Sequence, residues 1–149
     1  MIERVTDINA VPEDDLKALG EGFVREARVP GGFNVDVFKR NWSMILGRNM
    51  GAMWIIRNGK IQGALGAIMH PDINDDQPVA QETFWFVAPE YRGGTMGIRL
   101  LNEFETWAAF HGAKRIISAH LTTSMPEKVA RVFQRRGYYP AETVHIKVL

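Results

Sequence analysis

A glycine-rich segment near the middle of the chain has the residue types and spacing of a phosphate-binding loop. The segment reads Val87-Ala-Pro-Glu-Tyr-Arg-Gly-Gly-Thr-Met-Gly97, with the basic Arg92 at its edge. It follows an aromatic, strand-like run over residues 82–87 and leads into a helical pattern that begins near Met96. The N-terminus of a helix offers unpaired N–H groups and the positive end of a dipole. We therefore expect it to bind a phosphate or pyrophosphate.

Two common phosphate-binding motifs do not fit this segment. It lacks the Gly-Lys-Ser/Thr of a P-loop, and residues 93–97 lack the G-x-G-x-x-G spacing of a dinucleotide-binding turn. A glycine pair after a strand is also often only a turn. The spacing alone therefore leaves both interpretations open.

The segment resembles motif A of the GCN5-related N-acetyltransferases, the GNAT superfamily. That motif has the form V-x-P-x-x-R/Q-x-x-G-x-G/A, and Val87, Pro89, Arg92 and Gly97 match it. Thr95 stands where the family usually has its first glycine. A positive φ is unfavourable for a β-branched residue such as Thr95. We therefore expect Gly93 and Gly94 to adopt the positive φ that the loop needs. The Thr95 hydroxyl could then donate to a phosphate or cap the helix.

The resemblance is strongest between residues 80 and 139, and short phage- or prophage-type members look closest in general pattern. The shared features are the Phe104-Glu105-x-Trp107-Ala108 run and the final Gly137-Tyr138. The resemblance implies one α/β (α+β) domain over residues 1–149. Its mixed, mostly antiparallel sheet would have about six to seven strands, splayed at the centre, with about four helices.

In this family the loop binds the pyrophosphate of coenzyme A, so the resemblance implies acetyl-CoA as co-substrate. The pantetheine arm would lie between two splayed strands, here residues 83–88 and 115–121, and pair with the free edge of the first. The residues expected to contact the cofactor are Phe86, Val87, Arg92, Gly93, Gly94, Thr95, Met96, Gly97 and Phe133.

Direct acetyl transfer to an amine requires a base for the ammonium proton, donors for the developing oxyanion and an acid for the leaving thiolate. The resemblance implies that a backbone N–H near Val87 is the oxyanion donor. Glu82 and His120 are the candidate bases, the first through a water molecule and the second because imidazoles exchange protons near neutral pH. A β-bulge is common at this point in the family. Because a shift of one residue reverses the side of the sheet, the sequence leaves open which face of the sheet Glu82 lies on.

The acid is where the chain departs from the family, which often has a tyrosine four residues before the helix-ending glycine. Here that position is Phe133, which cannot donate a proton. Tyr138 is the candidate acid, although its position is normally a packed aromatic. Other hydroxyls that could serve belong to Tyr139, Ser124 and Thr122.

Hydrophobic periodicity predicts alternating elements along the rest of the chain. We expect helices starting near Pro12 and Asn34, and an Asn58-Gly59 hairpin turn. Ser124-Met-Pro-Glu127 resembles a capping box for a last helix that ends at Gly137. The expected strands are residues 2–8, 52–57, 60–69, 79–88, 115–121 and 143–149, and the long helix is 93–111.

Composition excludes several classes of function. The chain has 149 residues, a net charge of +1 and no cysteine. Disulfides, thiolate metal sites and a cysteine nucleophile are therefore excluded, and we expect no metal. The weak net charge argues against a nucleic-acid partner, and the absence of a signal peptide or long apolar run argues against a membrane and for a cytoplasmic location.

The leading hypothesis is an acetyl-CoA-dependent N-acetyltransferase acting on a primary amine of a small molecule or a protein. The alternative is a GNAT-fold module that binds an acyl-CoA or a partner without efficient turnover, which Phe133 and Thr95 favour. A homodimer is compatible with either. The acceptor amine has no diagnostic motif.

Overall fold

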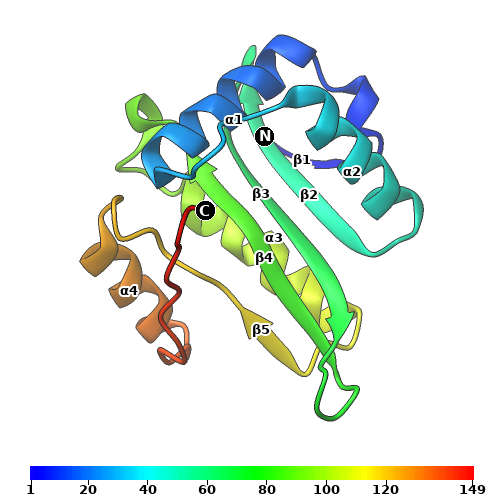
Figure 1. Ribbon diagram of the computed structural model, residues 1–149, viewed down its shortest axis with the longest axis vertical. Helices are drawn as coiled ribbons and strands as arrows, with labels where there is room; N and C mark the ends of the chain where they lie inside the picture. The colour runs from blue at the N-terminus through cyan, green and yellow to red at the C-terminus, as the bar shows by residue number, and fades with distance from the viewer.

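The structure, a computed structural model, describes residues 1–149 and contains one sheet flanked by helices (Figure 1). The sheet order is β1-β2-β3-β4-β5; β1 to β4 pair antiparallel and β5 is parallel to β4. The elements are β1 (Ile2–Val5), η1 (Ile8–Ala10), α1 (Glu13–Ala27), α2 (Val35–Gly47), β2 (Gly51–Asn58), β3 (Lys60–Pro71), β4 (Pro78–Val87), η2 (Pro89–Tyr91), α3 (Met96–Phe110), β5 (Arg115–Ile117) and α4 (Pro126–Arg135).

Both faces of the sheet are covered, so its central strands are buried on both sides. Along β2, Met53 and Ile55 face the cluster under α1 and α2. Trp54 and Ile56 face the opposite cluster, under α3. Figure 1 shows α1 and α2 across one face, α3 across the other, and α4 beyond β5. This layered arrangement confirms the predicted α+β class, a mixed sheet with helices on both faces.

Local sequence signals account for several element boundaries. The Asn34 side chain accepts a hydrogen bond from the Val37 N–H and caps α2, as predicted. Gly59 has φ of 74° between β2 and β3, and Gly137 has φ of 88° after α4. Both glycines take the left-handed conformation that their predicted turn and helix end require.

Strand β4 contains the irregularity that shapes the rest of the molecule. On β3, Gly66 pairs with Phe84 and Ala67 pairs with Glu82, so Thr83 is an extra residue. The Thr83 hydroxyl donates to the Gly66 carbonyl at 3.0 Å. On its other side β4 pairs with β5 only from Val79 to Gln81. Beyond that point the two strands diverge, which confirms the predicted splay.

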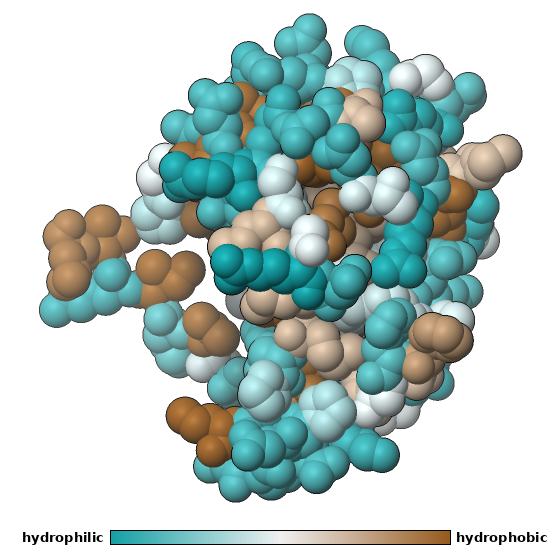
Figure 2. All heavy atoms as spheres, turned by 90° about the vertical axis from the view of Figure 1, so that its right-hand side faces the viewer, coloured by the Kyte–Doolittle hydropathy of each residue, from teal (hydrophilic) through white to brown (hydrophobic).

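The sheet has five strands rather than six to seven: the predicted C-terminal strand is absent, and another predicted strand is shorter than expected. Strand β5 ends at Ile117 instead of residue 121. Residues 143–149 form no strand, since their backbone has no neighbouring strand to bond. Their alternating Val144, Ile146 and Val148 are 76%, 70% and 69% exposed. Figure 2 shows an apolar arm standing out from the body.

The predicted capping box before α4 does not form. The helix starts at Pro126, whose fixed φ suits a first helical position. Met125 precedes it with φ of 44° and gives no side-chain cap. Ser124 instead lies near the Glu26 side chain of α1 and contributes to lowering its pKa.

Small residues on β3 let helix α2 approach the sheet, as the sequence predicted. A Cβ at Gly66 would lie 2.5 Å from Phe84 and 2.6 Å from Trp42. We expect Gly66→Ala to lower the free energy of unfolding by about 1–3 kcal/mol, because the rings cannot move without disturbing both neighbours. Urea denaturation measures it.

Gly47→Ala is the matched control, since nothing lies within 4 Å of a Cβ at that position in α2. It should change stability by less than about 1 kcal/mol, and in the stabilising direction. Equal effects of the two variants would contradict the close packing described for Gly66.

Candidate active site

A cavity of about 290 Å³ opens where β4 and β5 diverge. Its walls come from four parts of the chain: the C-terminal half of α1, strand β4 with the loop that follows it, the start of α3, and α4 with the segment before it. The predicted residues Glu82, Phe86, Val87, Arg92, Gly93, Gly94, Met96, Gly97 and His120 all line it. The splay therefore brings most of the candidate residues to one site.

The glycine loop offers open backbone donors at the start of α3. Met96, Gly97 and Ile98 have N–H groups without an acceptor, because the first bond of the helix runs from Arg99 to Thr95. Nothing lies within 4 Å of a Cβ at Gly93 or Gly94, so the space in front of the loop is free. This arrangement suits an anion that approaches the backbone closely.

The positive φ in the loop occurs at a glycine, as expected from the sequence. Gly93 has φ of 93°, whereas Thr95 has φ of −98° and ψ of 0°. A β-branched residue adopts the latter conformation without strain. The Thr95 hydroxyl makes no cap bond to α3, and the side chain is not part of the cavity wall.

Arg92 points away from the glycine loop. Its Nε donates to the Val87 carbonyl at 2.7 Å, and its Nη2 donates to Glu26 on α1 at 2.5 Å. The guanidinium also lies over the Phe86 ring, 5.5 Å from its centroid. Sequence reasoning placed Arg92 against a phosphate, and it missed Glu26 because the two residues are 66 positions apart.

Trp85 is a second residue that the sequence analysis missed. Its indole Nε1 is buried without a hydrogen-bond partner. The ring lies against the start of α3, 3.2 Å from where a Cβ of Gly97 would be. A buried donor without an acceptor is unfavourable, so this N–H beside the open helix N-terminus fits a site built to receive an acceptor group. Its position in an aromatic strand gave no chemical signal.

Glu82 lies at the mouth of the splay, directly before the bulged Thr83. Its Oε2 accepts a hydrogen bond of 3.2 Å from the Ala119 N–H beyond β5. Burial raises the pKa of Glu82 to about 7, and the Ala119 bond opposes that shift only in part. A carboxyl group with this pKa can exchange a proton near neutrality.

The aromatic candidates are less well placed. Phe133 is 8% exposed and packs among Trp85, His120 and Tyr138, outside the cavity wall. Tyr138 is also outside it: its hydroxyl donates to Glu105 at 3.0 Å, and burial together with Glu105 raises its pKa. The structure therefore does not bring Tyr138 to the other candidates.

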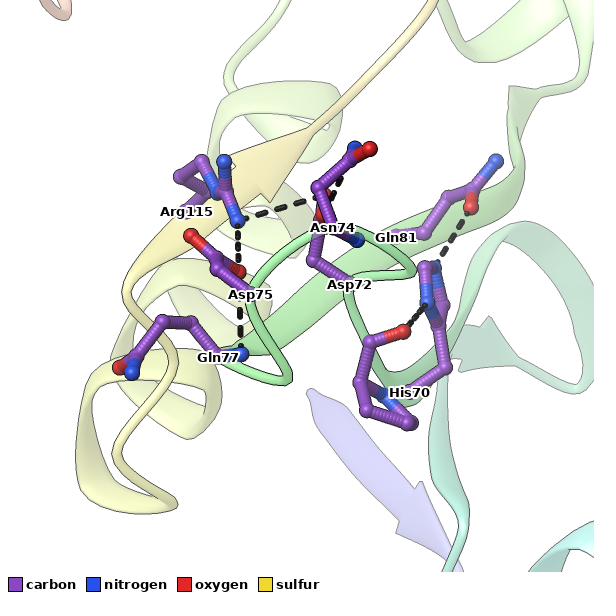
Figure 3. A network of polar contacts seen from close by, with 8 residues as sticks. His70, Asp72, Asn74, Asp75, Gln77, Gln81 and Arg115 are labelled. Carbon is purple, nitrogen blue, oxygen red and sulfur yellow. Dashed lines mark hydrogen bonds and ion pairs between the residues drawn. The ribbon is translucent and has the colours of Figure 1, made fainter.

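The acidic loop between β3 and β4 has a structural role at the far end of β4 (Figure 3). Arg115 on β5 bonds Asp75 at 3.0 Å and pairs with Asp72 at 3.2 Å. Asp72 and Asp75 also accept backbone N–H groups of Asn74 and Gln77. These contacts join the loop to the first residue of β5, where the strands still pair.

Neither a metal site nor a membrane span emerges from the geometry. No group of three or more His, Asp or Glu side chains is arranged to hold a metal ion. None of the helices is both long and apolar enough to cross a bilayer.

The loop geometry predicts how two substitutions rank in cofactor binding. We expect Gly94→Val to weaken coenzyme A binding more than Arg92→Ala does. A valine blocks the approach of phosphate to the backbone, whereas Arg92 already has protein partners. Isothermal titration calorimetry with coenzyme A measures both. Thermal unfolding should show Gly94→Val folded as wild type, since its side chain meets no neighbour; the opposite ranking in affinity would mean that side chains, not backbone, bind the phosphate.

Comparison with known proteins identifies the family. The family model described as the acetyltransferase (GNAT) family matches residues 21–138. No curated protein matches the sequence. The likeness to phage- or prophage-type members stays a prediction.

Solved acetyltransferases share the fold at low sequence identity. One from Trypanosoma brucei has a TM-score of 0.71 at 17% identity and covers 100% of both chains. Glucosamine-6-phosphate N-acetyltransferase from Arabidopsis thaliana has a TM-score of 0.69 at 12% identity, covering 99% of this chain and 98% of its own.

A third structure holds a ligand. AAC(6')-Iy, in complex with the bisubstrate analogue CoA-S-monomethyl-acetylneamine, has a TM-score of 0.71 at 21% identity over 100% of this chain and 97% of its own. The family model covers well over half of the chain. The chain therefore belongs to the acetyltransferase (GNAT) family, whose enzymes are acyltransferases that use acetyl-CoA as co-substrate.

Proposed function

We propose that this protein transfers the acetyl group of acetyl-CoA directly to a primary amine of a small molecule or protein, with Glu82 as the general base. The observation that carries the proposal is the position of Glu82. Its carboxyl group has a pKa of about 7 and lines the same cavity as the open glycine loop. A base with a pKa near the working pH is both available and strong enough to take an ammonium proton.

His120 is the competing base, because it lines the same cavity. Glu82 is preferred on geometric grounds. The Ala119 N–H holds one of its oxygens and leaves the other free. The imidazole of His120 has no hydrogen-bond partner among the protein groups and rests at 6.4 Å from the Phe133 ring. A base that is held in one orientation is better suited to proton transfer.

Backbone alternation along β4 supports an oxyanion donor at Val87. The Ala88 N–H donates to Gln62, at the start of β3. Backbone groups of neighbouring residues in a strand point to opposite edges, so the N–H and carbonyl of Val87 face the splay. The Val87 N–H is therefore the proposed donor to the thioester oxygen as the amine attacks.

Neither Phe133 nor Tyr138 is placed to protonate the departing thiolate. Phe133 has no hydroxyl, and the Tyr138 hydroxyl is bonded to Glu105. This observation favours the second candidate function, a module that binds acyl-CoA without efficient turnover. Thiol release with a panel of amines separates the two functions, because only an acetyltransferase releases coenzyme A at a rate that depends on the amine.

Replacing the proposed base provides the main test. We expect Glu82→Gln to lower kcat/KM by about 10²–10⁴-fold with little change in the dissociation constant of coenzyme A. The wild-type rate should rise with pH as Glu82 loses its proton near pH 7, and this rise should disappear in the variant. Steady-state kinetics over a pH series measures both effects.

His120→Ala and Glu103→Gln are the comparison variants. Both should keep the rise near pH 7, and Glu103→Gln should also keep the wild-type rate because it replaces an exposed residue of α3. Wild-type rates and pH profiles in both Glu82→Gln and His120→Ala would show that neither side chain is the base.

The raised pKa of Glu82 also has a signed effect on stability. The folded protein binds the Glu82 proton more tightly than the unfolded chain does. Stability therefore falls as pH rises from about 4.5 to about 7. The Gln variant lacks this loss, so relative to wild type it should be more stable at pH 8 than at pH 5. A pH-independent difference in thermal unfolding would contradict the burial of the carboxylate.

A hydroxyl at the position where the family often has a tyrosine tests whether the reaction needs an acid. We expect Phe133→Tyr to remain folded and, if thiolate departure limits the rate, to raise kcat several-fold while coenzyme A affinity stays unchanged. The ring lies between Trp85 and Tyr138, at centroid distances of 5.7 Å and 5.0 Å. Stopped-flow thiol release measures the step. An unchanged rate would show that protonation is not limiting, and lost cofactor binding would show that the ring only packs.

A further inference from the structure

Glu26 and Arg92 form an ion pair across the cavity that none of the proposed chemical steps uses. Glu26 lies in the last turn of α1, and Arg92 follows η2. Their side chains are 17% and 22% exposed, and both line the cavity. The pKa of Glu26 is lowered chiefly by its hydrogen bond to Arg92, so the carboxylate remains charged.

Arg92 donates a hydrogen bond to a backbone carbonyl at the free edge of β4. Its Nε bonds the Val87 carbonyl, which faces the splay. An extended ligand that adds to this edge as a further strand needs the same carbonyl. The cofactor arm and the Arg92 side chain therefore meet at one acceptor, from which a bound arm would displace the guanidinium. Arg92 is followed directly by Gly93 of the glycine loop. The displaced guanidinium would therefore lie close to the pyrophosphate of the bound coenzyme.

Displacement of Arg92 leaves Glu26 without a cation. Ser124 is then the one other side chain that helps to lower the pKa of Glu26. The Glu26 carbonyl is held by the Thr123 hydroxyl at 2.6 Å, which fixes this turn of α1 over the cavity. A partly buried carboxylate without a counter-ion is unfavourable. The cavity thereby gains a site for a positive charge only after the cofactor has bound.

We propose that Glu26 selects acceptors that carry a second cationic group, and that Arg92 masks this carboxylate until the coenzyme displaces it. This inference rests on the proposed acetyl transfer, since the amine that reacts is the one that Glu82 deprotonates. Glu82 and Glu26 line one cavity, so a diamine can present one nitrogen to each.

The test compares 1,4-diaminobutane with 1-aminobutane, which match in length and differ by one charge. Calorimetry is done with and without coenzyme A, which has no acetyl group and allows no turnover. We expect coenzyme A to tighten diamine binding about tenfold and monoamine binding much less. By linkage, the diamine should tighten coenzyme A binding by the same factor.

Variants separate the charge from the fold. Glu26→Gln should abolish the coenzyme-dependent gain for the diamine. Arg92→Ala should give tight diamine binding without coenzyme A. Glu21→Gln, at an exposed position of the same helix, should behave as wild type. Equal binding of the two amines in the wild type, or retained discrimination in Glu26→Gln, would overturn the inference.

The outcome is distinct from that of the proposed function. Discrimination in the binding assay together with no amine-dependent thiol release would refute acetyl transfer and leave the Glu26 site standing. Transfer that depends on Glu82 but treats both amines alike, with equal KM and kcat, would refute the Glu26 site alone.

Discussion

The divergence of β4 from β5 is the constraint on which the site depends. Parallel pairing lasts for three residue pairs, from Val79 to Gln81, and the extra residue Thr83 follows directly. A bulge bends its strand and increases the local twist, so β4 cannot keep its spacing from β5 beyond that point. Two consequences follow together. The edge of β4 loses its neighbour, and the Glu82 carboxyl group is buried with one backbone N–H, that of Ala119, to bond. The exposed edge and the perturbed carboxyl group therefore have one cause.

An opened sheet needs other contacts to fix its geometry, and polar pairs supply them at three points. The Arg115 contacts with Asp72 and Asp75 secure the paired end of β5. Arg136 bonds Glu105 and so joins the end of α4 to α3 on the far wall. The Arg92–Glu26 pair joins the glycine loop to α1 at the mouth. The first two pairs lie away from the cavity and have no competing ligand. The third lies in the path of the ligand, which is why a change of partner is argued only for it.

Short-range signals in the sequence were sufficient for most of the elements and for the conformation of the glycine loop. Asn34, Asn58-Gly59 and Gly137 act on residues within one turn, so their structures follow from local sterics and hydrogen bonding. The site required more. The orientation of Arg92 depends on a glutamate 66 residues away, and the burial of Glu82 depends on the bulge. The strand predicted at 143–149 does not form for a related reason. Alternating hydrophobicity specifies which residues share a face, but it does not provide a neighbouring strand for backbone hydrogen bonds.

The relative difficulty of the two proton transfers explains why acetyl transfer remains feasible with a phenylalanine at the position where the family often has a tyrosine. An ammonium group of the lysine type has a pKa of about 10.4, and a thiol has a pKa of about 8.5. Near pH 7 the amine is almost entirely protonated and cannot attack, whereas a thiolate is a stable enough leaving group to depart with help from water. Loss of the base therefore removes the nucleophile, while loss of the acid affects a step that is already easier. The structure has the corresponding asymmetry: Glu82 is held at the cavity with a pKa of about 7, and the aromatic position is filled by Phe133. The carboxylate of Glu26 affects the affinity for a charged acceptor rather than the rate of either proton transfer, because it binds the nitrogen that does not react.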